Sequence, residues 1–134
     1  MAEKGMEQLE YDKTGVVEAL RSIAERRGVK AVKERSYTGV SGLKHLFDFT
    51  LVRGGDDVKV DVAYSRGVVD EKGVIAGYAK LIDTGAQGYV LVAWPRLSGE
   101  AKTLAAHYKM KVIEASTFEE LERAFSTLLD GLKG

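Results

Sequence analysis

Two segments of alternating hydrophobicity, joined by a glycine-rich turn, restrict the possible folds of this chain more than any other feature. Residues 43–53 (LKHLFDFTLVR) and 58–65 (VKVDVAYS) alternate as β-strands do, and GGDD at 54–57 is typical of a hairpin turn. Both faces of the first segment carry apolar side chains, which predicts a central strand that is covered on both sides. Its predicted faces are His45, Phe47, Phe49 and Leu51 on one side and Leu46, Asp48, Thr50 and Val52 on the other.

The patterns on either side of this hairpin predict helices that alternate with further strands. The continuous apolar run at 88–94 is typical of a strand in the middle of a sheet. We expect helices over 14–28, 70–82, 98–108 and from 117 onward, and strands over 29–33, 88–94 and 111–115. The helix over 70–82 is expected to bury Val74, Ile75, Ala79 and Ile82. The order αβββαβαβα predicts an α/β fold with a mixed central sheet flanked by helices.

The composition is that of one globular domain. The 134 residues are 45% hydrophobic, and we expect a single domain over 1–134 with residues 1–12 as a loose polar lead-in. The chain has no cysteine, which excludes disulfides and cysteine nucleophiles. No apolar run approaches the roughly 20 residues of a membrane span, and the polar N-terminus lacks the apolar segment of a secretory signal. We therefore expect a cytoplasmic protein.

Asp48 and Asp61 are unusual because each lies within an apolar strand pattern. Burying an unpaired carboxylate costs several kcal/mol, so each of these side chains needs a partner. Two carboxylates on neighbouring strands of a hairpin can converge on one divalent cation, which prefers oxygen ligands. The alternative is that each aspartate pairs with a nearby lysine or arginine, or lies where the sheet is hydrated.

A series of segments around these acids resembles a known family. The segments are SGLKHLFDF (41–49), VKVDVAYS (58–65), AGYAKLIDTGAQ (76–87), YVLVAWP (89–95) and SGEAKTLAAHYKMKVIEA (98–115). In this order they resemble the PD-(D/E)XK nuclease superfamily, in particular archaeal proteins related to the Mrr-type restriction endonucleases. The resemblance covers most of the chain and implies a restriction-endonuclease-like sheet, DNA binding and a Mg²⁺ or Mn²⁺ cofactor.

The resemblance also implies roles for individual residues. Asp48 matches the first metal-binding acid and Asp61 the second, so both are expected to be catalytic and to bind metal. The family has a lysine two residues after the second acid, but this chain has Ala63 there. Lys59 lies two residues before Asp61 on the same strand face, and we expect it to serve as a displaced catalytic lysine. Its alternative role is that of a solvated lysine which pairs with Asp61.

Four residues near the loop at 38–42 form an expected nucleic-acid-binding surface. Ser41 lies in this loop, and His45 matches a histidine of the family motif. Lys44 and Arg35 are basic residues close to the same loop and are candidates for phosphate contacts. Turn formation by Ser41, packing of His45, and protection of an edge strand by Lys44 and Arg35 are the alternatives.

Three functional hypotheses follow from these residues. The first is a nuclease-fold protein that binds DNA or a branched nucleic acid and has lost most or all cleavage. The second is an active Mg²⁺-dependent endonuclease that uses Asp48, Asp61 and Lys59. The third is a non-catalytic interaction or scaffold domain, in keeping with the formal net charge of zero. The sequence predicts no membrane partner and leaves a homodimer open.

Overall fold

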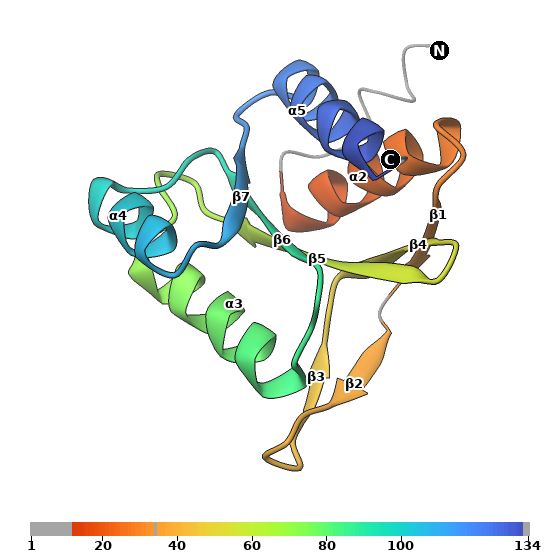
Figure 1. Ribbon diagram of the computed structural model, residues 1–134. Coiled ribbons are helices and arrows are strands. Elements are labelled where there is room, and N and C mark those ends of the chain that lie inside the picture. Colours follow the sequence, from red (N-terminus) through yellow and green to blue (C-terminus); the bar gives the residue numbers. More distant parts are fainter. Residues whose placement is uncertain (1–11, 34, 133–134) are drawn as a thin grey trace.

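The computed structural model describes residues 12–33 and 35–132, so most of the predicted lead-in lies outside the described residues (Figure 1). The elements occur in the order α2 (Lys13–Arg26), β1 (Lys30–Lys33), β2 (Ser36–Thr38), β3 (Lys44–Leu46), β4 (Phe49–Arg53), β5 (Asp56–Tyr64), α3 (Glu71–Thr84), β6 (Tyr89–Trp94), α4 (Gly99–His107), β7 (Lys111–Glu114) and α5 (Phe118–Gly131). The predicted class, an α/β fold with a mixed sheet flanked by helices, is confirmed.

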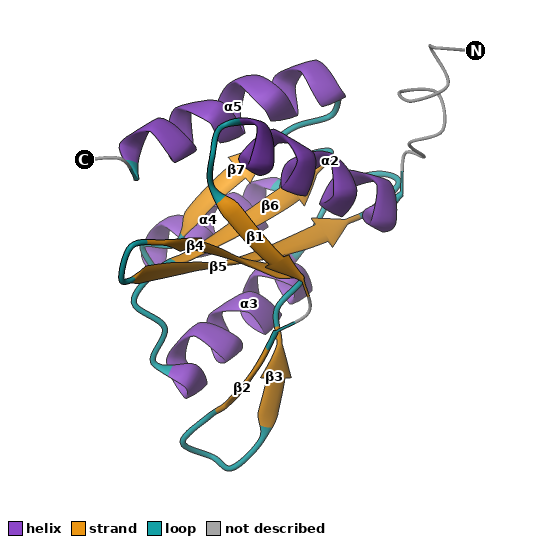
Figure 2. Ribbon diagram, turned by 90° about the vertical axis from the view of Figure 1, so that its right-hand side faces the viewer, coloured by secondary structure: helices purple, strands orange, loops and turns teal. Residues whose placement is uncertain are grey.

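Five strands form the central sheet in the order β1-β4-β5-β6-β7. Strands β1, β4 and β5 pair antiparallel, as expected for a hairpin with a short loop. Strands β5, β6 and β7 pair parallel, and the helices α3 and α4 make the crossovers between them. Strands β2 and β3 form a separate two-stranded hairpin, which projects from the sheet (Figure 2).

The helices cover the two faces of the sheet in pairs (Figure 1). Helices α2 and α5 pack on one face over a large apolar cluster that includes Phe49, Val60 and Phe125. Helices α3 and α4 pack on the other face over a smaller cluster that includes Phe47 and Leu91. The sheet is therefore covered on both sides at its centre, as the apolar run at 88–94 predicts: all six residues of β6 are buried.

The prediction of one continuous strand over 43–53 is wrong. The strand is interrupted between β3 and β4, and β3 pairs with β2 in the separate hairpin. Phe47 lies in the cluster under α3 and α4, whereas Phe49 lies in the cluster under α2 and α5. The two phenylalanines thus face opposite sides of the sheet although they are two residues apart. The break contains Asp48, and it changes which face the following side chains occupy.

The prediction for the buried face of α3 is also wrong in part. Val74 is fully buried, but Ile75 and Ile82 are exposed. The helix approaches the sheet through small residues instead: a Cβ added at Gly77 would lie 2.5 Å from Tyr89 Oη. The apolar pattern of α3 favours burial of the side that carries the two isoleucines, because their side chains are large. The structure buries the side that carries Gly77 instead, because glycine lets the helix approach the sheet closely.

Polar side chains cap three of the helices at the positions where the sequence predicts these helices to begin. Asp70, Ser98 and Thr117 cap α3, α4 and α5, and each accepts a hydrogen bond from a backbone N–H of the first turn. In the described part of the chain, no helix is both long enough and apolar enough to cross a membrane.

Candidate functional site

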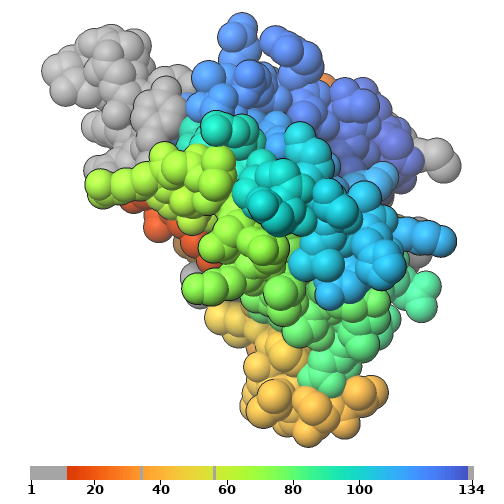
Figure 3. All heavy atoms as spheres, turned by 90° about the vertical axis from the view of Figure 1, so that its left-hand side faces the viewer, coloured from red at the N-terminus to blue at the C-terminus, as the bar shows by residue number. Residues whose placement is uncertain are grey.

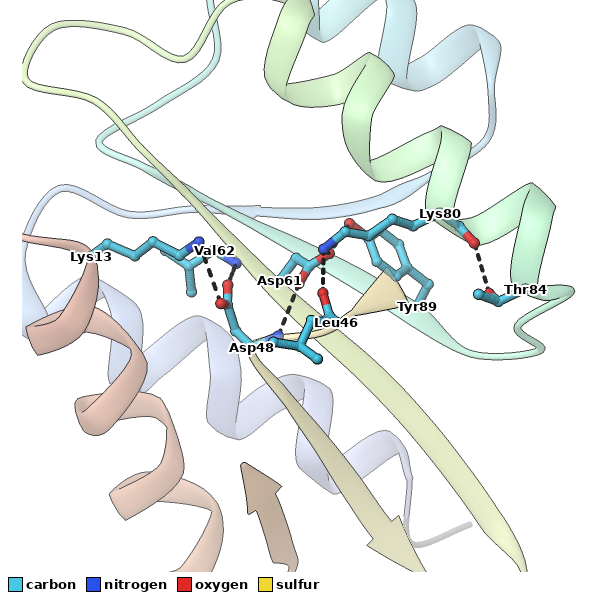
Figure 4. A network of polar contacts seen from close by, with 8 residues as sticks. All are labelled: Lys13, Leu46, Asp48, Asp61, Val62, Lys80, Thr84 and Tyr89. Carbon is cyan, nitrogen blue, oxygen red and sulfur yellow. Dashed lines mark hydrogen bonds and ion pairs between the residues drawn. The ribbon is translucent and has the colours of Figure 1, made fainter. Parts of the chain in front are cut away.

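The strand break brings Asp48 and Asp61 into direct contact (Figure 4). Regular pairing of β4 with β5 ends at Phe49 and Val60. Beyond that point, the Asp48 N–H donates to Asp61 Oδ1 at 3.0 Å, and the Val62 N–H donates to Asp48 Oδ2 at 2.7 Å. The carboxylates replace the ladder hydrogen bonds that a regular strand would make here. Each aspartate thus binds the backbone of the strand that carries the other.

Asp61 is buried, with 7% of its surface exposed, and two side chains bind its second oxygen. Lys80 of α3 donates from Nζ to Asp61 Oδ2 at 2.9 Å, and Tyr89 of β6 donates from its hydroxyl to the same oxygen at 3.1 Å. Burial raises the pKa of Tyr89 above its ordinary value, and the neighbouring Asp61 charge raises this pKa further. The phenol therefore stays protonated and remains a donor to Asp61.

Lys80 also ties the site to the projecting hairpin. Its ammonium donates to the backbone carbonyl of Leu46 at 2.6 Å, in addition to Asp61. Thr84, one helical turn further along α3, donates from its hydroxyl to the Lys80 carbonyl at 2.7 Å. Lys80 thus connects α3, β5 and the end of β3 through one charged group.

Asp48 has its own lysine partner. Lys13, the first residue of α2, lies with Nζ 3.3 Å from Asp48 Oδ1. The Lys13 side chain is 54% exposed, whereas that of Asp48 is 22% exposed. Because exposed ion pairs are weakened by water and salt, this ammonium can leave Asp48 at little cost. The two carboxylates are therefore matched by two ammonium groups, of which Lys13 is the more exposed.

Lys59 does not reach Asp61. Its ammonium lies 4.3 Å from the centre of the Tyr37 ring, in a cation–π contact. The ion pair that the structure shows at Asp61 is made by Lys80. The position of the family lysine, Ala63, is half-buried and faces α3: a Cβ added at Gly73 would lie 3.5 Å from Ala63 Cβ.

A cavity of about 220 Å³ lies beside Asp61, between α3 and the sheet. Small residues of α3 leave this space open, and charged or polar side chains line one side of it. The lining includes Lys13, Asp61, Lys80 and Tyr89 together with Ala63, Gly73, Ala76 and Gly77. The space thus brings one carboxylate and two ammonium groups to the wall of a single cavity.

Ser41 and His45 both bind Asp83, near the end of α3. The Ser41 N–H donates to Asp83 Oδ1 at 2.9 Å, and the Ser41 hydroxyl donates to Oδ2 at 2.6 Å. His45 Nε2 lies 2.6 Å from the same Oδ2. The hydrogen bonds from Ser41 and then from His45 lower the pKa of Asp83. We call these three residues the hairpin clasp, because they fasten the β2–β3 hairpin to α3.

The basic candidates Arg35 and Lys44 lie on the outside of the hairpin. The Arg35 guanidinium lies 5.7 Å from the centre of the Tyr37 ring and 3.7 Å from Asp57 Oδ2. Lys44 is exposed on β3. The structure therefore separates the four expected nucleic-acid-binding residues: Ser41 and His45 bind the protein itself, whereas Arg35 and Lys44 remain accessible.

A divalent cation at the break would find Asp48 and Asp61 as its protein ligands. Two adjacent carboxylates offer about eight lone-pair positions, of which Val62 N, Lys13, Asp48 N, Lys80 and Tyr89 use five. The described residues contain no group of three or more acids and histidines that could surround a metal. A cation would thus have two protein ligands and otherwise water, which fits Mg²⁺ better than an ion that needs a full protein cage.

Sequence reasoning missed Lys80, Lys13, Tyr89 and Asp83. Tyr89 stands at the start of a buried strand, where it resembles any core aromatic residue, and Lys13 precedes the predicted start of its helix. Lys80 and Asp83 are three residues apart, which places them on neighbouring positions of one helix surface. The opposite charges of Lys80 and Asp83, on a helix that connects two parallel strands, were the signal in the sequence that these residues make tertiary contacts.

The comparisons with known proteins show a similarity of fold alone. No family model matches the chain, and no curated protein matches its sequence significantly. The solved structure of AF1548, a protein of unknown function, aligns with 72% of this chain at 16% identity and a TM-score of 0.61. That of VC1899 from Vibrio cholerae aligns with 90% of this chain at 15% identity and a TM-score of 0.57. The matches span 56% and 33% of those longer chains.

Proposed function

We propose that this chain is a nuclease-type domain that binds nucleic acid and cleaves phosphodiesters slowly with a divalent cation. The observation that supports this function is the position of Lys80, whose ammonium lies 2.9 Å from Asp61 Oδ2 beside the Asp48–Asp61 pair. The family that the sequence resembles has a lysine where this chain has Ala63. Lys80 brings a positive charge to the same carboxylate from a helix rather than from the strand.

In such a site, a divalent cation and the protein side chains would have different roles in cleavage. Mg²⁺ or Mn²⁺ held by Asp48 and Asp61 would supply Lewis acidity and make a bound water more acidic. Lys80 would bind a phosphate oxygen and offset the negative charge that develops during cleavage. Tyr89 keeps Asp61 oriented through its 3.1 Å hydrogen bond. Lys13 and Lys80 compete with the cation for the carboxylates, which is why we propose slow cleavage.

A second candidate function is nucleic-acid binding without cleavage. The observation that favours it is that each oxygen of Asp48 and Asp61 already accepts a hydrogen bond or ion pair from the protein. Two lysines balance two aspartates, so the site is electrically complete without a metal. In this case the lysines would replace the cation as well as the catalytic lysine.

Cleavage assays with lysine variants test the proposal. Labelled duplex, single-stranded and branched DNA would be incubated with Mn²⁺ and the parent chain, Lys80→Ala or Lys59→Ala. We expect Lys80→Ala to lower the rate by about a hundredfold, because a positioned charge is worth this much in a transition state. Lys59→Ala is the matched control from the same sheet face, and its rate should equal that of the parent.

Two results would contradict this proposal. Loss of activity in Lys59→Ala but not in Lys80→Ala would assign the catalytic charge to the displaced strand lysine. A parent chain that binds DNA but cuts no substrate with Mg²⁺ or Mn²⁺ would exclude cleavage and leave the second candidate. Urea unfolding of each variant separates lost chemistry from lost folding.

The position of Ala63 supplies a further test. Because Ala63 is half-buried and lines the cavity beside Asp61, a lysine there would add another ammonium group to a site that already contains Lys80. We expect Ala63→Lys to be less stable than the parent and no more active, since Lys80 already supplies the charge. An Ala63→Lys variant that folds normally and cuts at least tenfold faster would show that Lys80 does not replace the family lysine.

We further propose that the protein acts in the cytoplasm on DNA or a branched nucleic acid. The absence of cysteine supports the location, and the accessible Arg35 and Lys44 support the partner. Cell fractionation followed by immunodetection tests the location. Binding that weakens as salt increases would support the partner, because phosphate contacts release counterions.

A further inference from the structure

The β2–β3 hairpin carries three large apolar side chains in contact with solvent. Val40 is 92% exposed, Leu43 is 64% exposed and Leu46 is 54% exposed. Single exposed apolar residues are ordinary, but three within seven residues of one projecting element indicate a contact surface. The hairpin forms the projecting end of the molecule in Figure 3, below α3.

Hydrogen bonds to Asp83 fasten the tip of the hairpin to α3. Val40 N donates to the Asp83 carbonyl at 2.8 Å, and Ser41 binds the Asp83 carboxylate with both its N–H and its hydroxyl. A side chain at Gly39 would overlap that carboxylate. The polar groups of the loop therefore point toward α3, and its apolar side chains are left facing outward.

The charge around the hairpin differs from that of the rest of the chain. Residues 35–46, which form the hairpin and the residue before it, contain one arginine, one lysine and no acid, and this arginine also pairs with Asp57. The opposite sign prevails in 117–132 of α5, with four acids and one arginine. Helix α5 and the hairpin lie at opposite ends of the molecule (Figures 1 and 2). A polyanion is therefore attracted to the hairpin end.

The hairpin is also directly connected to the proposed cleavage site. Leu46, the last residue of β3, shares the Lys80 ammonium with Asp61. Leu43 is five residues from Asp48, or about 16 Å along an extended chain. This distance is about five base steps of a duplex, at about 3.4 Å per step. A duplex with a phosphate at Asp61 would thus reach the tip within half a helical turn.

We propose that Val40 and Leu43 insert between stacked base pairs of duplex DNA held at the Asp48–Asp61 site, while Arg35 and Lys44 contact phosphates on either side. This inference rests on the proposed function and specifies its substrate as a duplex that is opened at one base step. Apolar side chains inserted in this way unstack bases and kink the duplex, and flanking cations position the backbone.

The test uses the full chain in EDTA, so that cleavage plays no part. Fluorescence anisotropy measures binding to a duplex that contains 2-aminopurine, whose emission rises when it is unstacked. The double variant V40S/L43S should bind about tenfold more weakly, abolish the rise in emission and keep the parent salt dependence. Ile75→Ser removes an apolar residue that is 50% exposed and lies about 12 Å along α3 from Asp83, and this variant should behave as the parent. Lys44→Ala should reduce the salt slope by about one phosphate contact.

Three outcomes would overturn the insertion proposal. If V40S/L43S folds, binds and unstacks DNA like the parent, the proposed function stands but the hairpin does not insert into the duplex. If the parent binds no DNA at any salt concentration, both proposals are rejected. If sedimentation shows a parent dimer that V40S/L43S dissociates while DNA binding is unchanged, the tip is assigned to a second copy of this chain.

Discussion

The two faces of strand β5 differ in kind, although their residues alternate along one segment. Val60 and Val62 face α2 and α5 and are buried in a cluster made of apolar side chains alone. Asp61, between them, faces α3 and is just as buried, but it is held by a lysine and a tyrosine. Replacing a buried ion pair by apolar residues is often neutral or stabilising, so stability does not explain the second face. The face of β5 toward α2 and α5 stabilises the fold, whereas the face toward α3 positions a buried carboxylate and its ammonium partner.

The largest effect should come from the apolar face. Phe125 of α5 is fully buried and packs edge-on against Phe49, with ring centres 6.3 Å apart. We expect Phe125→Ala to lower the free energy of unfolding by about 3–5 kcal/mol, because it leaves a large cavity in close-packed surroundings. Urea unfolding followed by circular dichroism measures this change. A loss below about 1 kcal/mol would mean that the α2–α5 layer is not the main source of stability.

On the charged face, Lys80 and Asp61 should show an interaction energy with each other, although the pair as a whole should add little to the free energy of unfolding. Lys80→Met removes the cation from buried Asp61, and we expect a loss of about 1–3 kcal/mol, reduced from that of a fully buried pair because Lys80 is 28% exposed. Adding Asp61→Asn should recover part of this loss, since the unpaired charge is then absent. A double-mutant cycle in urea measures the coupling. Additive losses would show that the Lys80–Asp61 contact carries no coupling energy.

The smallest effect concerns the hairpin clasp, which should open in acid. Hydrogen bonds from Ser41 and His45 lower the pKa of Asp83, so the ionised carboxylate favours the closed clasp. This contribution is fully present above the ordinary Asp pKa of about 3.9 and is lost as pH falls through the lower pKa of the folded state. Amide hydrogen exchange of Val40 and Ser41 should therefore accelerate, relative to the other loops, as the pH falls below about 4. In Asp83→Ala, exchange at these amides should already be fast at neutral pH. Equal protection in this variant and the parent would mean that the clasp does not hold the loop.

The overall architecture could be predicted because it depends on local patterns. Hydrophobic alternation predicted strands β4 and β5, the apolar run at 88–94 predicted β6, and the helix expected to begin at Asp70 is α3, which Asp70 caps. The break at Asp48 could not be predicted, because the alternation LKHLFDF continues across it without a glycine or proline. The break arises from tertiary contacts: Asp48 and Asp61 each bind the backbone of the other strand.

The part of the site that depends on local sequence pattern could also be predicted. Asp48 and Asp61 stand out as charges within apolar strands, so their pairing could be expected from the sequence. Lys80 lies 19 residues from Asp61 on a helix surface, where a lysine is usually solvated, and its contact depends on how closely α3 approaches the sheet. That approach depends on Gly77, which carries no apolar signal. Helix orientation therefore decides which lysine reaches the acid.

A calorimetric titration with Mn²⁺ tests most directly whether the charged face of β5 is a cation site. The parent should bind one ion weakly at the carboxylate pair, and both Asp48→Asn and Asp61→Asn should abolish the heat of binding while the chain stays folded. Lys13→Ala should bind the ion more tightly than the parent, because its ammonium no longer competes for Asp48 Oδ1, 3.3 Å away. Binding that is unchanged in both aspartate variants would contradict the account and leave Asp48 and Asp61 as a structural ion-pair network.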